Sequence, residues 1–286
     1  MKRDAGKALH LSHRSEEPAN PVPDQLLPGL WWLDRTRGCN VYLQRTLDDG
    51  AVIVDTGFGS NGRVIRDQVH ALGFEGRVRA ILLTHRHVDH TGAAASLVEL
   101  LGAPVVAGLG DCHTTAEGVT TLARDWSPPA LIRRPIGMLL GIGGSHRPVP
   151  VARPVDAETE VAPGILAIPA PGHTAGTICY IATETGATFV GDLCISYHDR
   201  LVRSMRLAND SHRGYMRSLR QLSPRVGDIG LPGHGYPVLS GFRDRFRALP
   251  AVAADLASPR PSPLRRARTF LTFAGFVLRP RRPGRP

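Results

Sequence analysis

Residues 84–90 read Thr84-His85-Arg86-His87-Val88-Asp89-His90, and this stretch decides the fold of the 286-residue chain. Residues 78–84 form an apolar run that predicts a buried β-strand, and residues 93–101 form a helix-like run that ends at Gly102. His85 and His87 stand two residues apart, so in an extended segment both imidazoles point to the same side. The stretch therefore predicts metal-binding side chains where a strand ends.

Three further segments carry donors of the same kind. They are His173 in Pro171-Gly172-His173-Thr174, Asp192 after Gly191, and His234 in Pro232-Gly233-His234-Gly235. Asp192 and His234 follow directly on apolar strands, whereas His173 follows a Pro-Gly turn after its strand. Loops at strand ends converge at one edge of a sheet, so we expect all of these side chains to meet there.

Together these donors are too many for one tetrahedral ion, and they predict a centre with two metal ions. Asp192 has two carboxylate oxygens and can bridge ions that lie ~3.5–4 Å apart. Zinc is the default ion, while nitrogen and oxygen ligands also fit manganese and iron. The donors can form a first set of His85, His87 and His173 and a second set of Asp89, His90 and His234, with Asp192 able to bridge them.

In the order of these motifs the chain resembles the metallo-β-lactamase fold superfamily. The resemblance includes an upstream Val54-Asp55-Thr56-Gly57 and covers roughly residues 27–240. It implies a four-layer αβ/βα sandwich of two mixed β-sheets flanked by helices, with the same division of the ligands. His173 and Asp192 look more like the glyoxalase II and lactonase branches than the true β-lactamases, which usually place a cysteine near the latter position. Cys194 is not interpreted as a ligand.

The expected chemistry is hydrolysis of a thioester, lactone or related ester by a metal-bridging hydroxide, because paired cations lower the pKa of water toward ~7. Asp89 is expected to shuttle the proton. Asp55 either hydrogen-bonds a metal ligand or the loop below the metals, or it only forms an Asp-Thr-Gly turn. The alternatives are a mono-iron sulfur dioxygenase on the same fold, and a phosphodiesterase or β-lactam hydrolase. The short stretch after His234 disfavours glyoxalase II itself, which has a helical glutathione-binding domain.

Local patterns predict the remaining elements. Short apolar runs between glycines and an Asp-Gly turn predict strands at 31–33, 41–43, 51–54, 165–168, 177–182, 187–190 and 229–231. Helical spacing predicts helices at 63–72 and 213–222 as well. The expected organisation is a disordered arm over 1–24, a metallo-β-lactamase-like domain over 25–250 with an insertion or lid at about 111–156, and a basic Arg/Pro-rich tail over 251–286.

Charge is distributed unevenly along the chain. The net charge is +10, yet residues 259–286 contain eight arginines and no acid, so the part of the chain before residue 259 is nearly neutral. A nearly neutral domain has no basic surface that could bind a phosphate backbone, so no nucleic-acid partner is expected for this part of the chain. The tail also carries an apolar run at 269–278, for which an anionic membrane surface, packing on the domain and nucleic acid are the alternatives. No nucleic-acid recognition motif supports the last of these alternatives.

Compartment and partners follow from weaker features. Four scattered cysteines, a polar N-terminus and the lack of a run of ~18 apolar residues predict a cytoplasmic protein. The expected partner is a small ester-like substrate. The identity of the substrate depends on the shape of the loops around the site, and the sequence does not indicate an oligomeric state.

Overall fold

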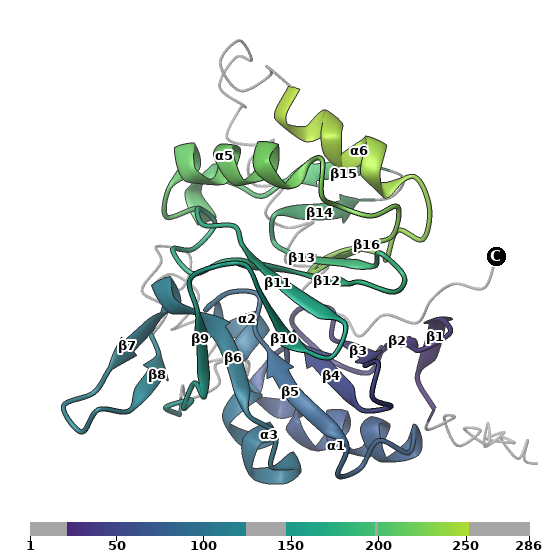
Figure 1. Ribbon diagram of the computed structural model, residues 1–286, viewed down its shortest axis with the longest axis vertical. Coiled ribbons are helices and arrows are strands. Elements are labelled where there is room, and N and C mark those ends of the chain that lie inside the picture. Colours follow the sequence, from purple (N-terminus) through teal and green to yellow (C-terminus); the bar gives the residue numbers. More distant parts are fainter. Residues whose placement is uncertain (1–21, 124–146, 198–199, 252–286) are drawn as a thin grey trace, which may run out of the picture.

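The computed structural model describes residues 22–123, 147–197 and 200–251, which form two facing β-sheets (Figure 1). The first sheet has seven strands in the order β1 (Asp24–Leu27), β2 (Leu30–Trp32), β3 (Tyr42–Arg45), β4 (Ala51–Val54), β5 (Val78–Leu82), β6 (Val105–Gly108) and β9 (Arg153–Val155). The second has five, in the order β10 (Thr159–Ala162), β11 (Ile165–Pro169), β12 (Ile178–Ala182), β13 (Thr188–Gly191) and β16 (Gly230–Pro232).

Both sheets are mixed, as predicted. In the first, β1 to β4 are antiparallel neighbours, whereas β4, β5, β6 and β9 pair in parallel. In the second, only the β13–β16 pair is parallel. The hairpin between β3 and β4 turns at Asp48-Asp49-Gly50, which contains the Asp-Gly turn of the sequence, and Asp49 has a φ of 58°.

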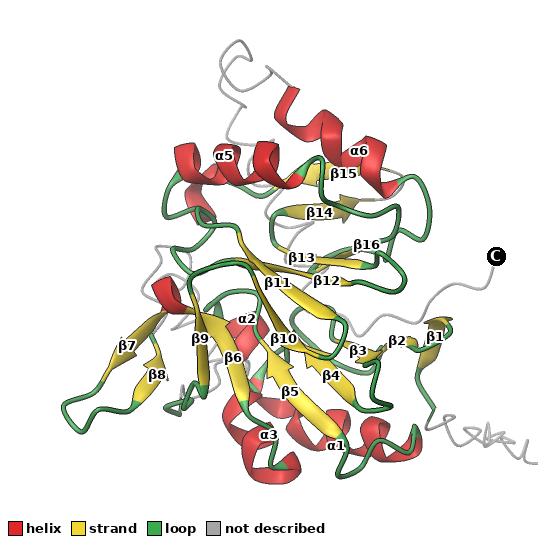
Figure 2. Cartoon of the chain, in the orientation of Figure 1, coloured by secondary structure: helices red, strands yellow, loops and turns green. Residues whose placement is uncertain are grey.

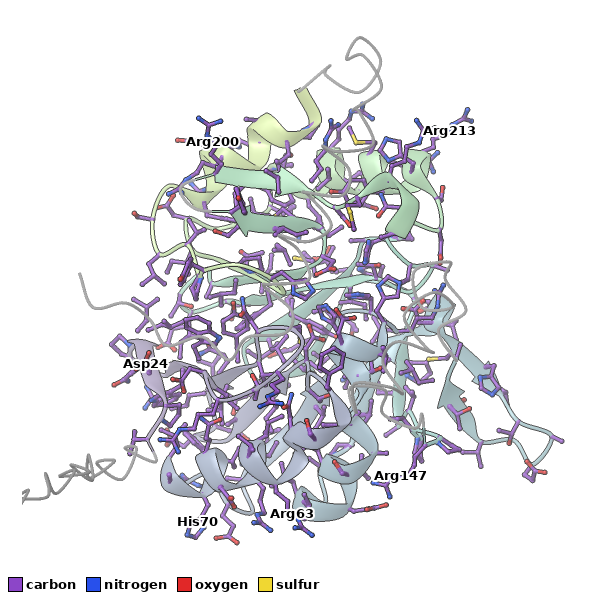
Figure 3. All side chains as sticks on the ribbon, turned by 180° about the vertical axis from the view of Figure 1, so that it is seen from behind. Asp24, Arg63, His70, Arg147, Arg200 and Arg213 are labelled. Atoms are coloured by element: carbon purple, nitrogen blue, oxygen red, sulfur yellow. The ribbon has the colours of Figure 1, made fainter. Side chains whose placement is uncertain are left out.

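Helices cover the outer faces of the two sheets (Figure 2). The first sheet packs on α1 (Gly62–Ala71) and α3 (Ala94–Leu101), and the second on α5 (His212–Leu222) and α6 (Phe242–Ala248). Arg63 and His70 of α1 lie at one end of the molecule and Arg213 of α5 at the opposite end (Figure 3). The four layers are therefore helix, sheet, sheet and helix, which confirms the predicted sandwich.

The buried runs fill the spaces between these layers. All four residues of β4 are buried: Val52 and Val54 face the second sheet, while Ala51 and Ile53 face α1 and α3. Successive side chains of a strand point to opposite faces, so a sheet covered on both sides needs an unbroken apolar strand. In β12 the side chains alternate in the same way between the inter-sheet core and the layer of α5 and α6.

The predicted insertion at 111–156 contains regular structure at both ends. A hairpin of β7 (Cys112–Thr114) and β8 (Thr120–Leu122) begins it, and β9 lies at the edge of the first sheet. The prediction missed β9 because Pro154 argues against a central strand, although proline is tolerated at a sheet edge. Residues 124–146 lie outside the described residues, so the lid stays a prediction.

The ends of the chain are described only in part. β1 begins at Asp24, which the prediction placed in the arm, and residues 1–21 lie outside the described residues. Of the predicted tail, the structure describes Ala251 alone, as the last residue of a 3-10 turn. Within the three described ranges, no helix is long and apolar enough to cross a membrane.

Candidate metal centre

The seven predicted ligands meet at the edge where the ends of both sheets face each other. The first sheet contributes the loop after β5 and the short helix α2 (Val88–Thr91), which carries Asp89 and His90. The second sheet contributes the turn after β11 with His173, and the residues that follow β13 and β16, namely Asp192 and His234. All seven side chains are buried, so they form a closed polar cluster.

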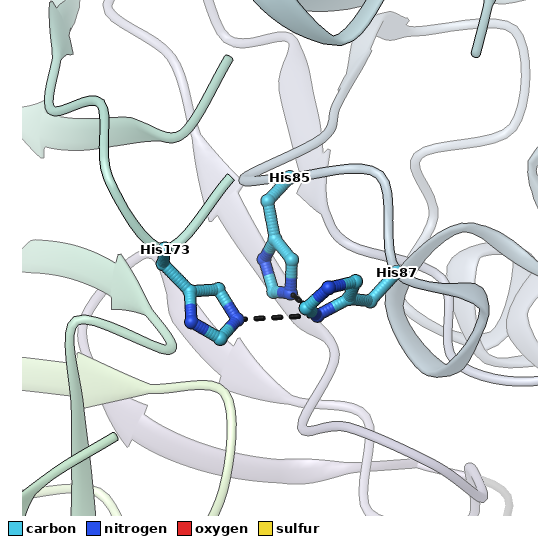
Figure 4. Close-up of side chains that lie close together, drawn as sticks. All are labelled: His85, His87 and His173. Carbon is cyan, nitrogen blue, oxygen red and sulfur yellow. Dashed lines mark hydrogen bonds between the residues drawn. The ribbon is translucent and has the colours of Figure 1, made fainter. Parts of the chain in front are cut away.

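The first set forms a compact triad (Figure 4). His87 Nδ1 lies 3.1 Å from His85 Nε2 and 3.1 Å from His173 Nε2. A neutral imidazole carries a single N–H, so one proton can serve only one of these contacts. A cation at the centre would serve all three nitrogens.

The second set forms a second triad beside the first. His234 Nε2 lies 3.4 Å from His90 Nε2 and 3.4 Å from Asp89 Oδ2. Asp192 stands between the triads: Oδ1 lies 3.3 Å from His90 Nε2 and 3.6 Å from His234 Nε2, whereas Oδ2 lies 3.6 Å from His173 Nε2. Each oxygen of this carboxylate thus faces a different triad.

In His85 and His90, the ring nitrogen that faces away from the centre is hydrogen-bonded, and this bond determines which ring nitrogen carries the proton. His90 Nδ1 lies 2.8 Å from Asp55 Oδ2, an acceptor, so Nδ1 carries the proton. The Thr84 hydroxyl donates its one proton to Asp55, so it accepts from His85 Nδ1 at 3.0 Å. Both rings therefore keep a proton on Nδ1 and turn Nε2 toward the centre, which is the orientation of metal-ligating histidines.

His173 is held in the same way by a different segment. Its Nδ1 lies 2.8 Å from the side-chain oxygen of Asn209, which accepts its proton, and 3.2 Å from Ser204 Oγ. For His87, the outer Nε2 is buried without a hydrogen-bond partner among the described residues. The donor set, three imidazole nitrogens with one carboxylate oxygen nearby, fits a borderline divalent ion.

Protonation of the cluster agrees with this arrangement at His85 and Asp192 but not at His90. Burial lowers the pKa of His90, yet Cys39, Asp55 and Asp192 raise it well above its usual value, so an ion at the second triad would displace a proton from this ring. Burial, followed by repulsion from His90 and the neighbouring imidazoles, holds the pKa of His85 well below its usual value. Burial alone would raise the pKa of Asp192, yet His234 and His90 hold it well below its usual range. His85 therefore stays neutral and Asp192 stays ionised near neutral pH, which are the forms that bind metals.

Asp55 hydrogen-bonds His90, one of the predicted ligands, which is the arrangement that the first of its two interpretations requires. Its carboxylate accepts from His90 Nδ1, from the Thr84 hydroxyl and, at 2.8 Å, from the Thr84 amide. The residue has a φ of 59°, a conformation that is uncommon outside glycine. Such a backbone is kept only where the surroundings hold it, and here three hydrogen bonds do so.

Other supporting residues were missed from the sequence. Asn40 Nδ2 donates to the carbonyls of Pro232 and Gly235, and the Tyr42 hydroxyl donates to Pro232, so the start of β3 and the segment just before it hold the loop of His234. Thr84 adjoins the histidine motif and could have been included. Asn209 lies far from any motif along the chain, and only the fold brings it to His173.

A comparison with protein families agrees with this geometry. The model of the metallo-beta-lactamase superfamily matches residues 34–234, a range that contains all seven ligand candidates. The chain belongs to the metallo-beta-lactamase superfamily. The predicted family and fold are thereby confirmed.

Several members of the superfamily with assigned names are similar to this chain. An atrochrysone carboxyl ACP thioesterase of Aspergillus fumigatus is 27% identical over 204 residues, which cover 70% of this chain and 51% of that protein. A hydroxyacylglutathione hydrolase of Cereibacter sphaeroides is 28% identical over 161 residues, or 56% of this chain and 49% of that protein. The chain thus spans about half the length of these relatives.

Solved structures of the superfamily share the fold. The crystal structure of TTHA1623 in a di-iron-bound form has a TM-score of 0.53 and 25% identity, and the match covers 78% of this chain and 97% of that one. The archaeal superfamily protein ST1585 of Sulfolobus tokodaii has a TM-score of 0.57 at 16% identity, covering 87% and 96%. The sandwich architecture therefore extends over most of this chain.

Proposed function

We propose that this protein is a binuclear metal-dependent hydrolase that cleaves a thioester, a lactone or a related ester. The observation that supports the proposal most directly is the pair of buried triads with the Asp192 carboxylate between them. Zinc is the proposed metal, although a solved relative of 25% identity is described in a di-iron-bound form. Relatives named as thioesterases and as a hydroxyacylglutathione hydrolase support the ester class of substrate.

In this proposal the ions are held by His85, His87 and His173 and by Asp89, His90 and His234, with Asp192 shared. When bound, such ions supply a hydroxide at neutral pH and polarise the substrate carbonyl. The chain's own residues fix the geometry: Asp55 and Asn209 hold His90 and His173 by their outer nitrogens.

Asp89 is the proposed proton carrier. Its buried carboxylate, 3.4 Å from His234, takes the proton of the attacking water and returns it to the leaving thiolate or alkoxide. The balanced reaction consumes one water and releases an acid and a thiol or alcohol. A lactone gives both groups in one molecule.

Two intact triads favour this function over a mono-iron sulfur dioxygenase, which would use only one of them. We also propose a cytoplasmic location, which the four free cysteines support because a reducing compartment keeps thiols unpaired. Contact between the basic tail and an anionic membrane stays a prediction, since residues 252–286 lie outside the described residues.

A substrate panel tests the proposed reaction. The purified full chain, supplied with zinc, manganese or iron(II), is assayed on an acyl thioester, a lactone, a β-lactam and a phosphodiester. We expect hydrolysis of the thioester or the lactone that a chelator abolishes. Turnover confined to the β-lactam or the phosphodiester would contradict the proposed substrate class, and oxygen consumption with a persulfide would favour the dioxygenase.

A further inference from the structure

Asp111 is a buried carboxylate that lies outside the metal centre and joins two of its loops. Its Oδ2 accepts hydrogen bonds from the Arg86 amide at 2.9 Å and from the Thr174 hydroxyl at 2.6 Å. Its Oδ1 accepts from Arg86 Nη1 at 2.8 Å and from the Gly176 amide at 2.9 Å. Arg86 stands between His85 and His87, and Thr174 follows His173, so this one carboxylate links the segments of all three histidines of the first triad.

The guanidinium of Arg86 extends the link to a third segment. Nη1 and Nη2 donate to the two oxygens of Asp210 at 2.9 and 2.8 Å, a bidentate pair. Asp210 also accepts from the Ala175 amide at 3.0 Å, and its own amide donates to the carbonyl of His173. The residue before it is Asn209, which accepts the Nδ1 proton of His173.

The backbones of the segments that carry Asp111 and His173 are in close contact. A Cβ at Gly108 would overlap the carbonyl oxygen of Gly176, and a Cβ at Gly110 would overlap that of Ala175. The end of β6 and the turn that carries Asp111 are therefore docked directly against the loop of His173. Glycines at these positions permit the close approach.

Burial makes these interactions more than a surface ion pair. The side chain of Asp111 is 1% exposed and that of Arg86 is 14% exposed, whereas Asp210 is 33% exposed. Removing one partner from a buried pair leaves an uncompensated charge, which is costly. Arg86 with its planar fork can contact both carboxylates at once, and a lysine cannot reproduce that geometry.

We propose that Arg86, Asp111 and Asp210 form a positioning clamp that sets the first histidine triad and thereby its affinity for a metal ion. The second triad has separate supports, because His90 rests on Asp55 and the loop of His234 rests on Asn40. The clamp should therefore act selectively on one of two neighbouring sites. This inference rests on metal binding at the triads, and it does not require that the protein hydrolyse an ester.

The test separates the two triads by mutation and measures affinity without turnover. In a His234→Ala background the first triad is the intact one, and in a His85→Ala background the second is. Metal-free protein of each background is titrated with zinc against a chromophoric chelator, with and without Asp111→Asn. Loss of a direct hydrogen-bond partner of a metal ligand weakens metal binding ~10–100-fold. Asp111 bonds the segments that carry the ligands and not their rings, so we expect a loss of about tenfold, in the first background only. In the second background we expect a change below about twofold.

Two further variants keep the test decisive. Arg225→Ala removes an exposed bidentate pair with Glu158, with contacts of 2.7 and 3.0 Å, and should leave both affinities unchanged. If Asp111→Asn does not fold, Asp210→Asn leaves the Arg86–Asp111 pair in place and should weaken the first triad alone, by several-fold. Unchanged affinity of the first triad, or an equal loss at both, would overturn the clamp. A chain that binds zinc at the first triad and hydrolyses none of the esters would count against the proposed function, while the same titrations still decide the clamp.

Discussion

Asp192 and Asp55 are the carboxylates on which the two triads depend. Asp192 directs one oxygen at each triad, and Asp55 fixes the tautomer of His90 while bonding both the amide and the hydroxyl of Thr84. The first was identifiable from the sequence because it follows an apolar strand. For Asp55 the sequence left two interpretations open, a hydrogen bond to a ligand or a plain turn, because an Asp-Thr-Gly turn has the same sequence.

Replacing Asp192 by alanine removes the shared carboxylate. Loss of an outer partner alone costs ~10–100-fold, so we expect hydrolysis to fall by more than ~100-fold and bound metal to fall to one ion or none. Elemental analysis and the esterase assay measure both. Asp156→Ala, at an exposed position, serves as the control and should retain both. Full activity in Asp192→Ala would exclude the bridging role.

Replacing Asp55 by asparagine tests support of the second triad. Asparagine tolerates the left-handed backbone at this position, so the change alters hydrogen bonding more than strain. The amide has one acceptor oxygen where the carboxylate has two, and His90 or Thr84 loses a partner. We expect affinity for the second metal to fall ~10–100-fold in a zinc titration. An unchanged titration would show that His90 keeps its orientation without Asp55.

Single strands position the metal loops through buried hydrogen bonds. β12 is buried along its whole length, and its Tyr180 hydroxyl donates to the carbonyl of Leu83, directly before the histidine motif, at 2.9 Å. This contact crosses from the second sheet to the first. It fastens the loop of His85 to the opposite half of the sandwich.

Replacing Tyr180 by phenylalanine keeps the packing of the ring and removes the donor. The Leu83 carbonyl is then a buried acceptor without this partner, so we expect a loss of ~1–3 kcal/mol in the free energy of unfolding. Urea denaturation measures it, with Tyr236→Phe as the control because that ring is 42% exposed and water can replace its bonds. Equal stability of the two variants would show that the contact contributes nothing.

The elements predicted correctly are those with unbroken apolar runs or clear helical spacing. α1 was expected at 63–72 and lies at Gly62–Ala71, and α5 was expected at 213–222 and lies at His212–Leu222. The missed elements are short and mostly polar. α6 has Phe242 and Phe246 as its buried residues among three arginines, and β15 (Arg200–Arg203) reads Arg-Leu-Val-Arg. Such segments become regular only because neighbouring strands and helices cover them.

The candidate metal centre joins the two halves of the whole molecule. Four of the seven proposed ligands follow β5 of the first sheet, and the other three lie on loops of the second. The sequence predicts both ligand sets because each lies beside a strand end. It does not predict the contacts between loops, since Asp111 and Asp210 come together with Arg86 only in the folded chain.

Metal removal should therefore destabilise the entire domain. An ion present at ~100 times its Kd stabilises the folded state by about 2.7 kcal/mol. For a domain of this size that corresponds to roughly 5–10 °C in Tm. We expect EDTA to lower the Tm by such an amount and added zinc to restore it, as followed by circular dichroism. A Tm that does not respond to either reagent would mean that the ligands hold their positions without metal.

The most direct test of the two-metal centre is the metal content of the full chain, purified without chelator and measured by elemental analysis against protein concentration. We expect about two divalent ions per chain, falling to about one in His234→Ala. A single iron per chain, unchanged in His234→Ala and accompanied by oxygen consumption, would contradict a two-metal centre.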